Sequence, residues 1–439
     1  VGDNFDSSPY LLYVGPSVAP SQQTMSNRDL HRLVVGNAVS TLGNAVYLIA
    51  VTLLLKELTQ SPFMLGAFQF LALLPGFVLS PLTGALIDRL PRRSIVIWSD
   101  LARGVLMIGA GMLLFWPPFV HPAALLLVSL GAGVGHAFFV PAAQALVPAL
   151  VPAERLQHAN GLRAAGSQVA NLAGNAVGGA MYTLLGAPVL LVLNGVSFLL
   201  SAAQERRIRS VDAVSTAGGT GQSVAAAARE GLQLLRRERS LRLLIASQAG
   251  LFFVSPVLML ALPFVVIDEL GHPPAVVGFM FSLALAGGIV GFGLLRRLPV
   301  DRMLRLPLVS GAYAAITGVF ALLAVTTTTG ALGTAALIFG LSSGTVYLTA
   351  VTWIQRRIPA NLHGRTFALL EAVSSLVAPV SYLAAGIVLE GLGSSRRWIA
   401  FAVLAGAGGL WTLITAFHAL RRRDSGSNTP PRAPGEHQA

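Results

Sequence analysis

The chain has 439 residues, of which 54% are hydrophobic and 11% are charged, and its formal net charge is +12. A soluble globular protein carries about 25% charged residues, so this composition excludes an ordinary soluble enzyme or binding domain. The chain contains no cysteine, which excludes disulfide bonds, thiolate metal sites and a cysteine nucleophile. We therefore expect no metal ion and no cofactor.

Residues 1–24 are polar, contain three prolines and lack a basic segment followed by an apolar core, so they do not resemble a signal peptide. Met25 begins a stretch that reads as a plausible mature N-terminus. The residues before it are predicted to be disordered or foreign to the native protein.

Apolar runs then alternate with short polar gaps. Each run has roughly 20 residues or more, the length that crosses a hydrocarbon core as a helix. The sequence therefore predicts an all-α polytopic membrane protein. We expect twelve spans, at about 33–55, 63–87, 94–116, 122–148, 158–184, 187–203, 242–267, 274–296, 305–326, 331–354, 364–389 and 397–419.

The arginines predict the orientation. Of the 30 Lys and Arg residues, 25 lie in the even-numbered gaps and the terminal segments, whereas the odd-numbered gaps contain only Lys56, Arg396 and Arg397. Basic loops stay in the cytoplasm, so both termini are expected there, in a bacterial inner membrane. The same topology accounts for the net charge without a nucleic-acid partner, and we expect a monomer embedded in the lipid bilayer.

The gap after the second span contains the most informative motif. A glycine is followed four residues later by an acid and then by a basic cluster: Gly84, Asp88, Arg89, Arg92 and Arg93. Glycine allows a close helix approach, and the arginines hold the hairpin in the cytoplasm. This segment resembles the loop 2–3 signature of the major facilitator superfamily. The alternative is an ordinary positive-inside loop.

The resemblance covers about residues 28–420 and is closest to the drug–proton antiporter branch that includes macrolide and siderophore exporters. Residues 138–162, 229–244 and 358–368 carry it. It implies the major facilitator fold, with twelve helices in two pseudo-symmetric six-helix halves and a substrate path between them.

One long gap separates the two halves. It opens with Glu205-Arg206-Arg207 and includes an amphipathic segment at 225–235, which we interpret as a helix on the inner leaflet or a solvated linker helix. The predicted segments are an N-terminal cytoplasmic segment, a first bundle, a linker, a second bundle and a disordered cytoplasmic tail, at 1–27, 28–203, 204–241, 242–420 and 421–439.

Three features depart from the antiporter pattern. In the fifth span the packing glycines Gly174, Gly178 and Gly179 remain, but a proline common in antiporters is missing. In the first span Asn44 stands where many relatives have an acid, and an amide carries no proton. In the second half an arginine at 296 matches Asp88. These departures leave the coupling ion open.

Ionisable residues within spans are costly, so they are functional candidates by default. Asp100 and Arg103 lie three residues apart and can meet on one helical face, where the favoured alternative is a structural ion pair. The candidate proton carriers are Glu371, Asp100 and His136. For each of them the alternative is a structural role. Their candidate charge partners are Arg103, Arg163 and Arg365.

The resemblance implies a cavity lined by the first, fourth, seventh and tenth spans. It also implies a cytoplasmic latch between the hairpin at Asp88 and the start of the eleventh span, near Arg365 and Glu371. An aromatic and amide lining suits a bulky, partly apolar compound. The candidate lining residues are Asn37, Ser40, Asn44, Tyr47, Phe138, Phe139, Gln248, Phe252, Tyr347 and Trp353.

The predicted function is export of bulky, partly hydrophobic small molecules, such as drugs, antibiotics or siderophores, in exchange for protons. The first alternative is an importer or uniporter of a small metabolite. A membrane enzyme ranks lower, because the eight histidines include no pair spaced as metal ligands on one helix. We assign no catalytic residue.

Overall fold

The computed structural model describes residues 27–208, 239–295, 305–325, 328–357, 360–393 and 397–424, and these contain helices and no strand. The amphipathic segment at 225–235, most of the N-terminal segment and most of the tail lie outside the described residues. So do the side chains of Asp88, Arg365 and Glu371.

The N-terminal half comprises six α-helices and two short 3₁₀ segments. They are α1 (Asn27–Thr59), α2 (Pro62–Val78), α3 (Ser80–Arg89), α4 (Arg92–Leu113), η1 (Pro117–Phe119), α5 (Pro122–Leu150), η2 (Ala153–Arg155) and α6 (Leu156–Glu205).

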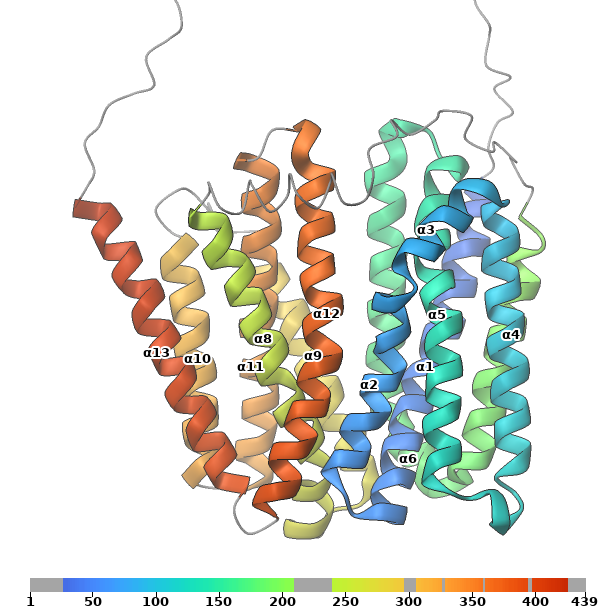
Figure 1. Ribbon diagram of the computed structural model, residues 1–439, viewed down its shortest axis with the longest axis horizontal. Coiled ribbons are helices and arrows are strands. Elements are labelled where there is room, and N and C mark those ends of the chain that lie inside the picture. The colour runs from blue at the N-terminus through green and yellow to red at the C-terminus, as the bar shows by residue number, and fades with distance from the viewer. Residues whose placement is uncertain are drawn as a thin grey trace, which may run out of the picture.

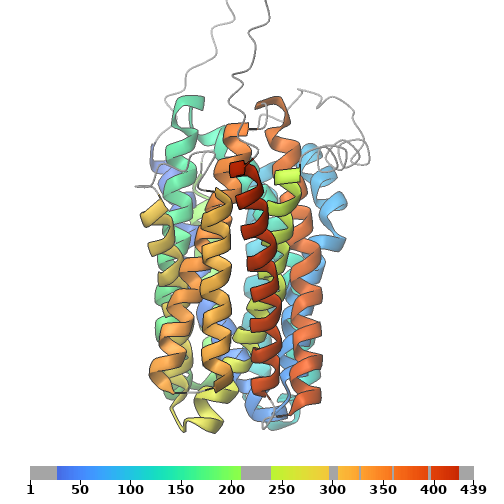
Figure 2. The same ribbon diagram turned by 90° about the vertical axis from the view of Figure 1, so that its left-hand side faces the viewer.

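The C-terminal half comprises six α-helices and one short π-helical segment. They are α8 (Arg239–Phe264), η3 (Val265–Glu269), α9 (Pro274–Leu295), α10 (Arg305–Val325), α11 (Thr329–Arg357), α12 (Ala360–Leu392) and α13 (Arg397–Asp424). The two halves stand side by side as separate bundles (Figure 1). Viewed from the C-terminal half, the helices run along one common direction (Figure 2).

Among the described residues, nine helices are long and apolar enough to cross a membrane, or ten if α2 and α3 form one bent span. The 50 residues of α6 would extend about 75 Å, more than twice a hydrocarbon core, so α6 is too long to be one span. It breaks at Gly186, whose φ of 74° is non-helical, between the predicted fifth and sixth spans. The count of twelve stays a prediction.

The predicted second span is not one straight helix. α2 and α3 meet at Leu79 with a bend of 49°. Pro81 lies in the first turn of α3 and has no N–H to donate to the preceding turn, which ends α2. The Ser80 hydroxyl donates instead to the carbonyl oxygen of Phe77, at 2.9 Å.

Glycines bring the two halves together at the end of the molecule opposite α3. There α2 packs on α12, and a Cβ added at Gly66 would lie 2.5 Å from the Tyr382 carbonyl oxygen and 3.2 Å from the Cα of Gly386. A second crossing joins α6 to α9, where a Cβ added at Gly179 would collide with the Pro274 carbonyl oxygen. Small residues permit this backbone contact.

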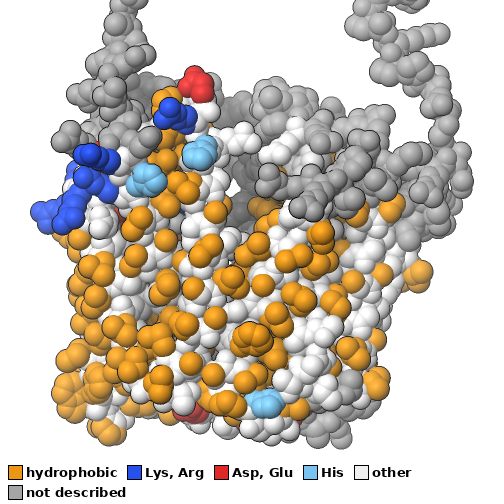
Figure 3. Space-filling view, turned by 180° about the vertical axis from the view of Figure 1, so that it is seen from behind, with side chains coloured by type: hydrophobic (Ala, Val, Ile, Leu, Met, Phe, Trp, Pro, Cys, Tyr) orange, Lys and Arg blue, Asp and Glu red, His pale blue; other side chains and the backbone are white. Residues whose placement is uncertain are grey.

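At the other end of the molecule, where α3 lies, the surface has a hollow (Figure 1 and Figure 3). Basic side chains gather near that end. We call the end opposite α3 the joined end, because the described contacts between the halves gather there, and the end with the hollow the open end.

The crossing of α6 and α9 predicts a steric test. Gly179→Ala should destabilise the protein by about 1–3 kcal/mol, because its methyl group must displace the backbone of α9. The check is the thermal unfolding midpoint in detergent. Gly76→Ala is the matched control, since a Cβ there meets nothing within 4 Å. Equal midpoints for the two variants would contradict the packing.

Candidate functional site

The N-terminal half contains a polar cavity of about 340 Å³ between α1, α4, α5 and α6. Six lining side chains are amides or hydroxyls, three are ionisable, and no aspartate or glutamate lines it. The lining residues are Asn37, Ser40, Thr41, Asn44, Arg103, His136, Phe139, Val140, Arg163, Ser167, Asn171 and Phe198. The cavity thus brings together three of the predicted ionisable candidates with four of the predicted lining residues.

Arg103 is the buried cation of this wall. Only 5% of the residue is exposed, and it forms the expected ion pair with Asp100 one turn earlier on α4. Its Nε donates to the Ser99 carbonyl oxygen at 3.4 Å. The guanidinium carbon also lies 4.4 Å from the ring centroid of Phe139 and 4.3 Å from that of Phe198. Two rings and a carboxylate therefore hold the guanidinium in place.

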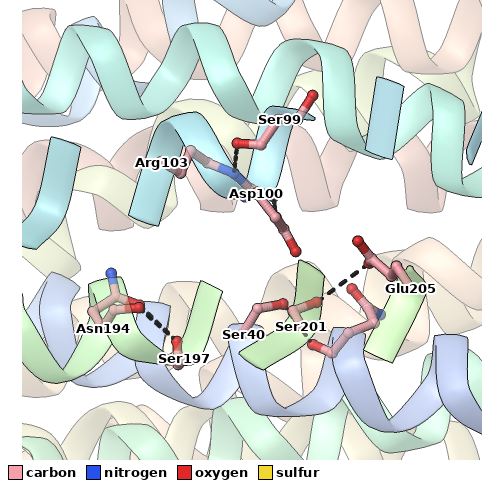
Figure 4. A network of polar contacts seen from close by, with 9 residues as sticks. Ser40, Ser99, Asp100, Arg103, Asn194, Ser197, Ser201 and Glu205 are labelled. Atoms are coloured by element: carbon pink, nitrogen blue, oxygen red, sulfur yellow. Dashed lines mark hydrogen bonds and ion pairs between the residues drawn. The ribbon is translucent and has the colours of Figure 1, made fainter. Parts of the chain in front are cut away.

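Behind Arg103 lies a buried carboxylate cluster (Figure 4). Asp100 and Glu205 both have no exposed surface, and the Ser201 hydroxyl donates to Glu205 Oε1 at 3.3 Å. In the part of the chain that the structure describes, no hydrogen-bond partner reaches Asp100 Oδ2 or Glu205 Oε2. The sequence placed Glu205 at the start of the linker, because a Glu-Arg-Arg run reads as an exposed loop. It is instead the last residue of α6.

Two further ionisable residues face the cavity. Arg163 is half-buried, and its Nε has no hydrogen-bond partner among the described residues. His136, on α5, has an exposed surface although it lines the cavity. Asn37 donates to the Ser167 hydroxyl at 2.9 Å, which ties α1 to α6 across the wall.

The predicted aromatic lining lies elsewhere. Tyr47 is buried against Phe68, with ring centroids 6.2 Å apart. Phe138 lines a separate, mostly apolar groove of about 620 Å³ between α3, α4 and α5. A helix presents successive residues about 100° apart, so Phe139 enters the cavity while its neighbour Phe138 does not.

The candidates from the second half do not line this cavity either. Gln248 and Trp353 are buried, Trp353 within the hydrophobic core. Phe252 is half-buried, and Tyr347 is 46% exposed with its ring 6.3 Å from that of Phe292. The pocket described here therefore belongs to the N-terminal half, and the predicted cavity between the halves stays a prediction.

The loop 2–3 segment bonds within its own half. Arg92 donates to the carbonyl oxygen of Ala145 on α5, at 3.0 Å. Arg93 donates to the carbonyl oxygen of Glu205, at 3.3 Å, and to that of Arg206. Gly84 is exposed, and a Cβ added there would meet no described atom within 4 Å, so the close helix approach at this glycine stays a prediction. The latch to the eleventh span stays a prediction, and it fits a molecule closed at this end.

The glycines of the fifth span do make close approaches. A Cβ added at Gly174 would lie 2.7 Å from both the Leu42 carbonyl oxygen and the Ala45 side chain, and at Gly178 it would lie 3.2 Å from Ile49. α1 and α6 therefore pack as closely as glycine allows, despite the missing proline.

Polar bonds between the halves were not foreseen from the sequence. Lys56, on α1, forms an ion pair with Asp268 of η3, and its side chain is only 3% exposed. Nearby, the Ser61 hydroxyl donates to Glu390 of α12 at 2.8 Å. In the sequence Lys56 reads only as one of the few basic residues in an outer gap. Its partner is 212 residues away, so no local pattern reveals it.

The profile of the Major Facilitator Superfamily matches residues 33–382. The chain belongs to this family. Macrolide efflux protein A of Streptococcus pyogenes is 23% identical over 376 residues, which are 83% of this chain and 90% of that protein. The putative bacilysin exporter BacE of Bacillus amyloliquefaciens is 35% identical over 182 residues, which are 40% and 43% of the two chains.

The crystal structure of the nucleoside transporter NupG superposes with a TM-score of 0.69 at 12% identity, over 90% of this chain and 100% of that one. This similarity shows the fold. The protein is a multi-pass membrane protein of the transporter family, and its family and relatives point to a transporter rather than an enzyme.

The ion pair between the halves predicts a conformational effect. Asp268→Asn should lower the free energy that holds the two halves together by about 1–3 kcal/mol. The substitution leaves the buried Lys56 ammonium without its counter-charge, and the cost is moderate because the Asp268 side chain is partly exposed. Pulsed spin-label distances between Leu58 and Pro273 should broaden. The charge-swapped double variant, Lys56→Asp with Asp268→Lys, should narrow them again. An unchanged distribution for Asp268→Asn would refute the role.

Proposed function

We propose that this transporter exports bulky, partly hydrophobic small molecules from the bacterial cytoplasm by alternating access, in exchange for protons. The observation that carries the proposal is the polar cavity beside a buried carboxylate cluster, in a molecule open at one end. The names of two relatives, a macrolide efflux protein and a putative bacilysin exporter, support the outward direction.

The open end faces the cytoplasm in this proposal. The arginines between α3 and α4 lie at that end (Figure 1). Arginine-rich loops remain on the cytoplasmic side during insertion. The structure then represents an inward-facing state, in which the cavity collects its substrate from the cytoplasm or the inner leaflet.

The lining suits a substrate with both a polar and an apolar part. Three asparagines and three hydroxyl residues offer hydrogen bonds, while Phe139, Val140 and Phe198 offer apolar contact. A cavity of about 340 Å³ holds part of a drug-sized compound, and the hollow at the open end can take the remainder.

Transport itself is tested in inverted vesicles from cells that express the chain. Acridine-type fluorescence reports the pH gradient while lipophilic cations, macrolides or siderophores are added one at a time. Dissipation of the gradient by one of these compounds, absent in vesicles without the protein, is the expected result. Accumulation of labelled compound with no proton movement would instead indicate a uniporter.

The orientation has a direct test, because the chain has no cysteine of its own. Phe119→Cys places an exposed thiol in η1 at the joined end, and Glu154→Cys places one in η2 at the open end. In intact cells a membrane-impermeant maleimide should label only the thiol at 119. Labelling at 154 without permeabilisation would reverse the orientation.

The cavity should set the apparent affinity. Asn171→Ala removes one amide from the wall, and a neutral hydrogen bond is worth about 1 kcal/mol, so the KM for a transported compound should rise about three- to tenfold. Asn160→Ala, at an exposed position on the same helix, is the matched control and should leave the KM unchanged. If the two variants behave alike, the cavity does not bind the substrate.

A further inference from the structure

The carboxylate cluster behind the cavity has more negative than positive charge. Asp100 and Glu205 are fully buried, and among the described residues Arg103 is the one cation paired with this cluster: it forms an ion pair with Asp100, and its charge also acts on Glu205. With both carboxylates ionised, the cluster carries one excess negative charge away from water. Burial of an uncompensated charge is strongly unfavourable.

The cluster also lacks hydrogen-bond donors. Arg103 donates to Asp100, and the single proton of the Ser201 hydroxyl is donated to Glu205 Oε1. Ser201 also lies within hydrogen-bond reach of Asp100, but one hydroxyl proton cannot serve both carboxylates. Among the described residues, Asp100 Oδ2 and Glu205 Oε2 have no hydrogen-bond partner.

We propose that Asp100 and Glu205 together bind one proton, the coupling proton of transport, and that Arg103 transmits its presence to the cavity. One bound proton removes the excess charge and supplies the cluster with a further donor. This assignment rests on the proposed proton exchange, and it adds Glu205, which no sequence pattern indicated.

The geometry gives the proton a path. α4 begins at Arg92, and Asp100 lies eight residues further on, which is about 12 Å along the helix. Arg103 lies about one turn beyond Asp100, further from the start of α4. Glu205 ends α6 at the same end of the molecule, where Arg93 bonds to its carbonyl oxygen. The carboxylate pair thus lies between the open end and the cavity.

The surrounding charges are few. On α4, Arg93 bonds only to backbone oxygens of Glu205 and Arg206. From α5, His136 lies across Arg103, and from α6, Arg163 lines the same cavity. From α1, Arg32 pairs with Asp29 and also bonds to the Arg207 carbonyl oxygen. Among the described residues, none of these bonds reaches Asp100 Oδ2 or Glu205 Oε2.

Proton binding and substrate binding are then linked through Arg103. When the pair loses its proton, Arg103 faces two carboxylates and the cavity wall becomes less positive. When the pair regains it, the wall becomes more positive. A basic, cationic substrate therefore binds better to the deprotonated protein, and linkage requires that each ligand weaken the other, as exchange demands.

The proton can be detected without any substrate. In pH-difference infrared spectra of the purified protein, a protonated carboxyl gives a carbonyl band outside the amide region. We expect Asp100→Asn and Glu205→Gln each to abolish a band that Glu154→Gln, an exposed control, retains. Ser201→Ala should shift the band, because it removes a donor and keeps both acids. A band that survives in both acid variants, or is absent from the wild type, overturns the assignment.

The coupling is tested in proteoliposomes with tetraphenylphosphonium as the cationic probe. Glu205→Gln should lose uptake driven by a pH gradient and should still catalyse counterflow of the labelled cation, which shows that the variant is folded. Its KM for counterflow should rise, because the neutral amide removes the same negative charge as the bound proton. Gradient-driven uptake equal to wild type would overturn the coupling role. If wild type shows no proton exchange, the proposed function fails, and the infrared band still decides whether the pair binds a proton.

Discussion

The burial of one guanidinium constrains the architecture of the N-terminal half. Arg103 in a membrane-spanning helix requires a counter-charge and dense contacts, and it receives Asp100 from its own helix and the rings of Phe139 and Phe198 from α5 and α6. α5 can pack this closely against the Arg103 side chain because Gly135 has no side chain of its own. A Cβ added at Gly135 would lie 2.5 Å from the Arg103 Cγ. Three helices are thus fixed around one charge, and the cavity forms on its open side.

A different force joins the halves. In a bilayer, apolar side chains gain little by leaving lipid, so association depends on close packing and polar bonds. Both occur at the joined end, where Gly66 and Gly386 allow backbone contact and Lys56 pairs with Asp268. These contacts lie within a hydrophobic cluster that includes residues of both halves, such as Leu53 of α1 and Val265 of η3. Apolar packing, close backbone contact and one ion pair therefore act together at the joined end.

The sequence predicted what depends on local pattern. The length of the apolar runs located most of the helices, and the spacing of Asp100 and Arg103 predicted their ion pair. The sequence could not predict that Glu205 lies beside Asp100 or that Asp268 pairs with Lys56. Both acids lie at the polar end of an apolar segment, where an exposed position is expected, and the groups beside them come from helices distant in the sequence. The sequence also placed Phe138 in the cavity, whereas it lines the separate groove. Neighbouring residues of a helix point about 100° apart, so an error of one residue in the helix phase moves a side chain to another face.

The position of the carboxylate pair explains how an exporter could work without an acid in its first span. Asn44 lines the cavity but cannot ionise, so in the proposed exchange a titrating group acts from behind the wall. Arg103 pairs with Asp100 and also lines the cavity, and the rings of Phe139 and Phe198 hold its guanidinium there. In that proposal a charge gained or lost at Asp100 and Glu205 changes the potential in the cavity, and the substrate does not touch the two acids.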